Sequence, residues 1–174
     1  MRRYRVGVVG AAGAVGLEMV RVLEESALKV EELRLMATQR KLSFRGEDHI
    51  VEVTETDRFE GLDFILMSAG SGPSRQLAPL AAEKGVVVID NSSAWRMDPD
   101  VPLVVPAVNG EVLTGKEKII ANPNCSTIQM VIALKPLHDA ARIKRVVVTT
   151  FQAVSGSGHK AVVELEEQIR AYMN

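Results

Sequence analysis

Residues 4–16 read YRVGVVGAAGAVG, a short β-rich run followed by three glycines spaced as GxxGxxG. The run 4–9 predicts a buried parallel strand, and apolar residues at helical spacing after it predict a helix over 14–28. Glycines between the two let backbone amides approach a pyrophosphate at the positive end of the helix. Gly10, Gly13 and Gly16 therefore predict a nucleotide-binding turn. The alternative is a tight turn that packs helix against strand without a ligand.

The rest of the chain alternates between strand-like and helix-like segments. We predict strands at 33–37, 50–53, 64–67, 86–89 and 118–121, helices at 73–84 and 125–140, and a polar loop at 39–48. This alternation predicts an α/β fold, a Rossmann-type doubly wound parallel sheet, over residues 1–124. A long strand at 143–154 and a helix at 160–173 follow, so we expect residues 125–174 to begin a second, α+β domain. Because the sequence stops inside that helix, we expect this domain to be incomplete.

The composition narrows the class of protein. The 174 residues carry a net charge of -1, with 47% hydrophobic and 25% charged residues, so neither nucleic acid nor a membrane surface is expected as a partner. No apolar stretch approaches the roughly 18 residues of a membrane span. Cys125 is the only cysteine, which excludes an intramolecular disulfide and fits a reducing compartment. Residues 1–10 are unlike a signal peptide, so the cytoplasm is the expected location, and no metal site is predicted.

The end of the second predicted strand indicates which nucleotide binds. NAD-binding proteins usually carry an Asp or Glu there for the ribose hydroxyls. This chain has Thr38, Gln39, Arg40 and Lys41, with two cations and no acid. The set predicts a site for a 2′-phosphate and hence NADP rather than NAD; a solvated basic loop is the alternative.

Residues 122–129 read NPNCSTIQ and hold the candidate nucleophile. Asn124 is a favourable N-cap, so Cys125 is predicted to lie in the first turn of the following helix. Free amides and the helix dipole favour a thiolate there, as a thioester mechanism requires, and the same amides could stabilise an oxyanion. A buried structural cysteine is the alternative. We interpret His49, His138 and His159 as surface residues, which leaves Cys125 without an identified general base.

Four segments together resemble one family. GAAGAVG at 10–16, DNSSAWRMDPDVPLVVPAVN at 90–109, NPNCSTIQ at 122–129 and FQAVSGSG at 151–158 are similar, in order and interval, to the aspartate-semialdehyde dehydrogenases. The resemblance implies that a Cys125 thiolate attacks the aldehyde of aspartate semialdehyde and that the thiohemiacetal gives a hydride to NADP⁺. Inorganic phosphate then cleaves the thioester to aspartyl 4-phosphate. In the cell the reductive direction would lead toward lysine, threonine and methionine.

The same resemblance assigns site residues. Cys125 matches the nucleophile, Gln152 a substrate-binding residue beside it, and Asn124 a residue that helps to hold the acyl oxygen. Arg96 matches the arginine of the phosphate site, where a planar guanidinium suits an oxyanion. The matching cofactor positions are Ala12, Gly13, Ala14, Val15, Thr38, Arg40, Lys41, Ser155 and Gly156. Without the resemblance, Arg96 could form a surface ion pair and Gln152 could be a polar residue of an edge strand.

Two positions depart from the family pattern, and the chain is short for the family. Ala12 stands where Thr is common, which removes one hydroxyl contact near the phosphates, and Ala107 stands where Glu is frequent.

Members of the family are roughly twice as long, with a general-base histidine and a carboxylate-binding arginine beyond position 174. We therefore expect no turnover from these 174 residues alone, and an unpartnered edge along 143–154. The full-length protein is expected to be a homodimer or homotetramer.

Besides a folded half that serves only as a structural partner, three other interpretations remain. N-acetyl-γ-glutamyl-phosphate reductase shares the thioester chemistry, but its cysteine segment usually reads NPGCYPT. Glyceraldehyde-3-phosphate dehydrogenase has SCTTN and normally uses NAD. A non-catalytic NADP-binding fragment would bind the nucleotide but carry an unreactive Cys125.

Overall fold

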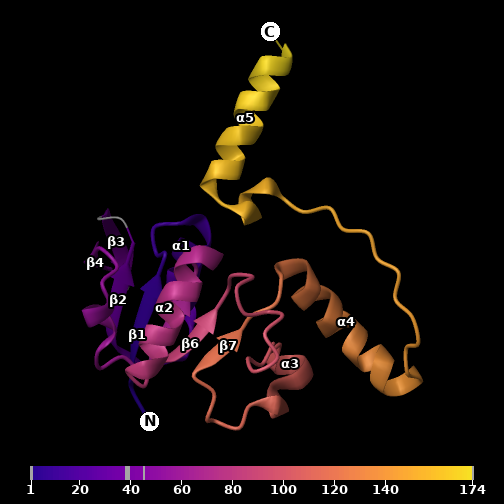
Figure 1. Cartoon of the computed structure of the whole chain (residues 1–174), viewed down its shortest axis with the longest axis horizontal. Helices are drawn as coiled ribbons and strands as arrows, with labels where there is room; N and C mark the ends of the chain where they lie inside the picture. Colours follow the sequence, from indigo (N-terminus) through magenta and orange to yellow (C-terminus); the bar gives the residue numbers. More distant parts are fainter. Residues whose placement is uncertain (1, 38–39, 45, 174) are drawn as a thin grey trace.

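The computed structural model describes residues 2–37, 40–44 and 46–173, and its core is a five-stranded sheet (Figure 1). The strands lie in the order β2-β1-β5-β6-β7, and every neighbouring pair is parallel. Their bounds are β1 Tyr4–Val9, β2 Val30–Met36, β5 Phe64–Met67, β6 Val87–Asp90 and β7 Ile119–Ala121. The predicted parallel α/β sheet is therefore confirmed.

Helices connect the strands and follow the last of them. The α-helices are α1 Ala14–Glu25, α2 Ser71–Glu83, α3 Pro106–Asn109, α4 Cys125–Ala141 and α5 His159–Met173. Three short 3₁₀ turns are η1 Thr56–Phe59, η2 Gly110–Val112 and η3 Val154–Ser157. The periodicity predicts α1, α2, α4 and α5 correctly. α1 ends earlier than predicted because the Ser26 hydroxyl donates a hydrogen bond to the Leu23 carbonyl at 2.8 Å and turns the chain.

Two hydrophobic clusters, one on each face of the sheet, form the core. Val8 and Val9 are neighbours on β1 and are buried in different clusters, because successive strand residues face opposite sides. The cluster around Val9 includes Ala78 of α2, and the cluster around Val8 includes Val20 of α1. The two helices therefore cover opposite faces, as a doubly wound sheet requires.

The predicted polar loop at 39–48 is wrong. The chain forms an antiparallel hairpin there, made of β3 Arg40–Phe44 and β4 Glu47–Val51. Gly46 in its turn has a φ of 81°, which glycine adopts freely. Phe44 and Val51 are buried in one of the two core clusters, so these two apolar residues anchor the hairpin to the core. The predicted strand 50–53 accordingly begins earlier and ends at Val51.

The predicted strand at 143–154 is also wrong. Residues 143–153 pair with no strand among the described residues and run as an extended connection to η3 (Figure 1). Backbone groups of a strand need a hydrogen-bonded neighbour, and this segment has none in the described part of the chain.

No described residue of α4, η3 or α5 is fully buried, and α5 stands clear of the sheet in Figure 1. The core therefore lies within the sheet and the helices that cover it.

The turn before β7 is fixed by Glu117. Its carboxylate accepts hydrogen bonds from the Thr114 hydroxyl at 2.6 Å and from the amides of Thr114 and Gly115 at 3.0 and 2.9 Å. These donors, the hydroxyl foremost, lower the pKa of Glu117 to about 2. β7 then pairs with β6 at the edge of the sheet and directs residues 122–124 toward the site described below.

Gly16 allows α1 to begin directly on the turn after β1. A Cβ there would lie 2.1 Å from the Gly10 carbonyl oxygen and 2.7 Å from the Ala11 Cα, and both are backbone atoms that cannot turn aside. We predict that Gly16→Ala lowers the free energy of unfolding by about 1–3 kcal/mol, measured by urea denaturation.

Gly72→Ala is the matched control. Gly72 lies in the first turn of α2, and a Cβ there would meet nothing within 4 Å. We expect this substitution to stabilise the protein by up to about 1 kcal/mol, through the higher helix propensity of alanine. Equal effects of the two substitutions would contradict the close helix–turn contact.

Candidate active site

Four loops converge at the carboxyl edge of the sheet. They follow β1, β5, β6 and β7, and parallel pairing brings them to the same edge. The direction in which strands are added reverses between β1 and β5, and ligands of open α/β sheets bind in the crevice at such a point. A cavity of about 840 Å³ lies there, lined by residues from all four loops. Residues 155–159 and Val162, from η3 and α5, also line it.

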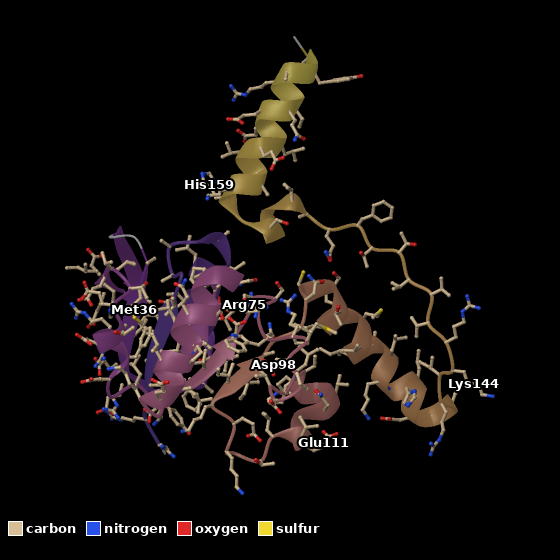
Figure 2. The ribbon with its side chains drawn as sticks, viewed as in Figure 1. Met36, Arg75, Asp98, Glu111, Lys144 and His159 are labelled. Atoms are coloured by element: carbon tan, nitrogen blue, oxygen red, sulfur yellow. The ribbon has the colours of Figure 1, made fainter. Side chains whose placement is uncertain are left out.

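The cavity is suited to an anion. α1, α2 and α5 begin beside it, with Ala14, Ser71 and His159 among its lining residues. Helix N-termini present unpaired amides and the positive end of the dipole. Figure 2 shows His159 at the foot of α5, the end nearest the sheet. Of the described residues that line the cavity, none is Asp or Glu, and Arg96 adds a positive charge.

The turn after β1 presents most of the predicted cofactor residues to the cavity. Residues 12–15 line it, whereas Gly10 does not. Gly10 has a φ of 85°, its amide donates to the Met36 carbonyl at 2.7 Å, and a Cβ would lie 2.4 Å from the Ser68 carbonyl oxygen. Gly10 therefore shapes the turn by close backbone approach, and the residues after it face the cavity.

The other predicted cofactor residues fall in two places. Ser155 and Gly156, in η3, line the cavity opposite the sheet loops. Thr38 lies outside the described residues, and Arg40 and Lys41 are placed only by their backbone, at the start of β3. The 2′-phosphate site therefore stays a prediction.

The predicted N-cap of α4 is confirmed. The Asn124 Oδ1 accepts hydrogen bonds from the Ser126 amide at 3.1 Å and from the Ser126 hydroxyl at 2.7 Å. Cys125 is the first residue of α4 and is exposed, so the alternative of a buried structural cysteine is wrong. Asn124 lines the cavity, and Cys125, the next residue, is not one of the lining residues.

Gln152 is brought to the same helix turn. Its Oε1 lies against the Ser126 hydroxyl, which can donate its single proton either there or to Asn124. Gln152 belongs to the extended segment 143–153 and not to an edge strand. Residues 28 positions apart in sequence, Asn124 and Gln152, are thus linked through one hydroxyl beside Cys125.

Arg96 is held by backbone carbonyls and not by an acid. Its Nε donates to the Asn122 carbonyl at 2.9 Å and its Nη2 to the Asn91 carbonyl at 3.0 Å. None of the ion pairs among the described residues involves Arg96, so the surface ion-pair alternative is wrong. Its charge is therefore available to a ligand in the cavity that it lines.

Sequence reasoning missed a buried polar network beneath Arg96. Asp90, Ser74 and Ser92 are the buried polar side chains of the described core, and they are joined by hydrogen bonds. The only signal in the sequence is an acid that ends the apolar run VVVI. His159 was predicted as a surface residue; it is exposed but also lines the cavity.

Metal-ligand clusters and membrane-spanning helices are both absent from the described residues. No group of three or more His, Cys, Asp or Glu side chains in this part of the chain could hold a metal ion. None of the helices described is both long and apolar enough to span a bilayer.

The Asn124 cap can be tested directly. We predict that Asn124→Ala weakens the first turn of α4 by about 1 kcal/mol, which corresponds to roughly fivefold faster exchange of the Ser126 amide in an NMR experiment. Asn124→Ser retains a capping oxygen and should exchange close to the original rate. Unchanged Ser126 exchange in Asn124→Ala would contradict the cap.

Comparison with known proteins shows similarity over both parts of the chain. Residues 5–116 match the NAD binding domain of semialdehyde dehydrogenases, and residues 134–174 match their dimerisation domain. Aspartate-semialdehyde dehydrogenase of Aquifex aeolicus is 55% identical over 97% of this chain and 52% of its own length. The chain therefore spans about half the length of the curated relatives it matches.

Solved structures agree. Aspartate semialdehyde dehydrogenase II from Vibrio cholerae, complexed with ASA, has a TM-score of 0.90 at 45% identity, covering 97% of this chain and 52% of that one. The Candida albicans aspartate semialdehyde dehydrogenase with NADP has a TM-score of 0.65 at 25% identity, covering 80% and 48%. As the resemblance of its four segments predicts, the chain belongs to the semialdehyde dehydrogenase family.

Proposed function

We propose that the full-length protein interconverts L-aspartate 4-semialdehyde and L-aspartyl 4-phosphate in a phosphate-dependent, NADP-linked reaction. The observation that carries the proposal is the exposed Cys125 thiol at the start of α4, next to a cavity that Arg96 and Asn124 line. The name shared by the Aquifex and Vibrio relatives supports the choice of substrate.

The first step is addition of the Cys125 thiolate to the aldehyde carbon. A C–S bond forms, and negative charge develops on the former carbonyl oxygen. Asn124 is arranged to stabilise that charge, because its Oδ1 is occupied by Ser126 and its Nδ2 has no partner among the described residues. Gln152, held beside the same turn, contributes a polar contact to the substrate.

The second half-reaction releases the product. A nicotinamide cofactor, when bound, would supply a hydride acceptor for the carbon that carries the sulfur, and Cys125 would then hold a thioester. A phosphate oxygen attacks the thioester carbon, the C–O bond forms, the C–S bond breaks, and the thiolate returns to Cys125. Arg96 is suited to hold this phosphate, because two carbonyls fix its guanidinium and no described carboxylate neutralises it. In the cell we propose the reductive direction, toward lysine, threonine and methionine.

We propose NADP as the cofactor. The amides of residues 12–15 would hold the pyrophosphate, with Ser155 and Gly156 on the opposite wall. A Cβ at Gly13 would lie 3.3 Å from the Gly10 carbonyl oxygen, so a side chain there would crowd the turn itself. Thr38, Arg40 and Lys41 would hold the 2′-phosphate, a choice that the NADP in the Candida relative supports.

The partners and the location belong to the same proposal. The match of residues 134–174 to a dimerisation domain supports a homodimer or homotetramer for the full-length protein, and we propose a cytoplasmic enzyme.

Among the described histidines only His159 lines the cavity, at the foot of α5. The general-base histidine and the carboxylate-binding arginine of the family match no position in these 174 residues, so we propose that these residues alone bind the cofactor but do not turn over.

The nucleotide preference can be measured on this chain. We expect calorimetric titration to show at least about tenfold tighter binding of NADP⁺ than of NAD⁺, because two cations near the ribose favour the 2′-phosphate. The double substitution Arg40→Glu with Lys41→Glu should remove the difference, whereas Lys116→Glu, in the loop before β7, should not. Equal affinities in the unsubstituted chain would refute the NADP assignment.

The reaction itself is tested with the full-length protein by following NADPH formation from L-aspartate 4-semialdehyde. We expect formation only when inorganic phosphate is present, and a loss of at least about 1,000-fold in kcat for Cys125→Ser. Arg96→Lys should raise the KM for phosphate roughly tenfold, because one ammonium cannot reproduce the planar fork. Arg58→Lys, whose partner Glu52 lies away from the cavity, is the matched control.

Two results would contradict this assignment. Phosphate-independent turnover would remove the proposed role of Arg96. Faster turnover of N-acetyl-L-glutamate 5-semialdehyde than of L-aspartate 4-semialdehyde would favour the related reductase.

A further inference from the structure

We propose that Asp90 is a positioning residue for Arg96, an inference that rests on the proposed phosphate site and adds a residue to it. Asp90 ends β6 and is completely buried. Its carboxylate accepts hydrogen bonds from the Ser74 and Ser92 hydroxyls, each at 2.7 Å, and from the Ser92 amide at 3.2 Å. None of the ion pairs among the described residues includes it.

A buried carboxylate that has only neutral hydrogen-bond donors around it contributes little to the stability of the fold. Its desolvation costs free energy that its hydrogen bonds offset only in part, and an apolar residue of similar size would avoid the cost. Groups of this kind instead fix the geometry of what binds them, since every donor must stay in place to satisfy the charge. The question is therefore which part of the molecule the Asp90 carboxylate fixes.

The carboxylate fixes the loop that follows β6. The Ser92 Oγ that donates to Asp90 accepts a hydrogen bond from the Ala94 amide at 3.1 Å. The Ser74 Oγ, on α2, accepts one from Trp95 Nε1 at 3.0 Å. The loop is thus tied to Asp90 at its beginning and, through Ser74, at the residue before Arg96.

Asp90 is also connected to the two residues whose carbonyls accept hydrogen bonds from the Arg96 guanidinium. Arg96 donates to the carbonyls of Asn91 and Asn122. Asn91 is the next residue after Asp90, and the Asn122 amide donates to the Asp90 carbonyl at 2.8 Å. The two asparagines are joined by a side-chain hydrogen bond of 2.6 Å. The Asp90 carboxylate therefore fixes the loop that carries Arg96, and the Asp90 backbone helps to space the two carbonyls that accept from the guanidinium.

This arrangement matters for an anion because the guanidinium is directional. A planar fork binds an oxyanion well only when its free N–H groups face the ligand, and a displacement of about 1 Å at such a site can cost on the order of 100-fold. If Asp90 acted only on folding, its replacement would weaken every ligand of the cavity alike. If it positions Arg96, the loss falls on the anion held by Arg96, and the cofactor turn after β1 is spared.

The experiment uses NMR on this chain, with inorganic phosphate and NADP⁺ as probes. The Arg96 Nε–H resonance reports the guanidinium, and the indole resonance of Trp95, the only tryptophan, reports the network. For Asp90→Asn we expect faster exchange of the Arg96 Nε–H, a shifted indole resonance, and at least about tenfold weaker phosphate binding. NADP⁺ affinity should change by roughly twofold or less. Asp63→Asn is the matched control, a carboxylate that binds the Arg5 amide before β5.

Each outcome decides one claim. A folded Asp90→Asn variant with unchanged Arg96 exchange and phosphate affinity overturns the positioning role, and so does an equal loss of phosphate and NADP⁺ binding. If Asp90→Asn does not fold, Ser74→Ala carries the test, because it cuts the link from Trp95 to Asp90 and should also weaken phosphate binding. If phosphate leaves the Arg96 resonance of the unsubstituted chain unmoved, the proposed phosphate site fails, while Arg96 exchange in Asp90→Asn still decides the positioning role.

Discussion

The parallel pairing of β1 with both β2 and β5 is the constraint on which the rest of the structure depends. This pairing leaves little space around the chain at the end of β1. There the Gly10 amide donates a hydrogen bond to the Met36 carbonyl of β2, and the Ser68 amide donates one to the Val9 carbonyl. α1 begins directly after this turn, so position 16 lies against the turn backbone and has no room for a side chain. The N-termini of α1 and α2 consequently lie beside one cavity, and its preference for anions follows from the sheet topology.

The charges at this edge are segregated. The described lining of the cavity has no acid and contains Arg96, which is tied down by carbonyls alone. The one fully buried carboxylate nearby, Asp90, binds hydroxyl and amide donors behind the loop and not the guanidinium. A direct ion pair between the two would cancel the charge that a phosphate needs. The network instead transmits the position of Asp90 to Arg96 and leaves the charge of Arg96 for the ligand.

What the sequence predicted well was local. The strand 4–9, the glycine turn and the Asn124 cap each depend on residues within a few positions of one another, and the structure has all three. The hairpin after β2 was missed because residues 39–48 are largely polar, and the burial of Phe44 and Val51 depends on α1 and the sheet. The segment 143–153 has a strand-like composition, but a strand also needs a neighbour, and composition cannot supply one.

The site divides in the same way. Cys125, Arg96 and Gln152 were identified by resemblance to a family, and the structure adds what the resemblance cannot give, namely the carbonyls that hold Arg96 and the hydroxyl that links Gln152 to the Asn124 cap. The Asp90 network joins β6, α2 and the following loop, which are separated in sequence. No spacing rule along the chain could have found it.

On this proposal, one cavity at the carboxyl edge of the sheet holds both the cofactor phosphates and the anion bound by Arg96. The most direct measurement is a crystal structure of this chain with NADP⁺ and inorganic phosphate. We expect the pyrophosphate on the amides of residues 12–15 and phosphate on the guanidinium of Arg96, next to Asn124. A nucleotide bound elsewhere, or an Arg96 that makes no contact with phosphate, would contradict it.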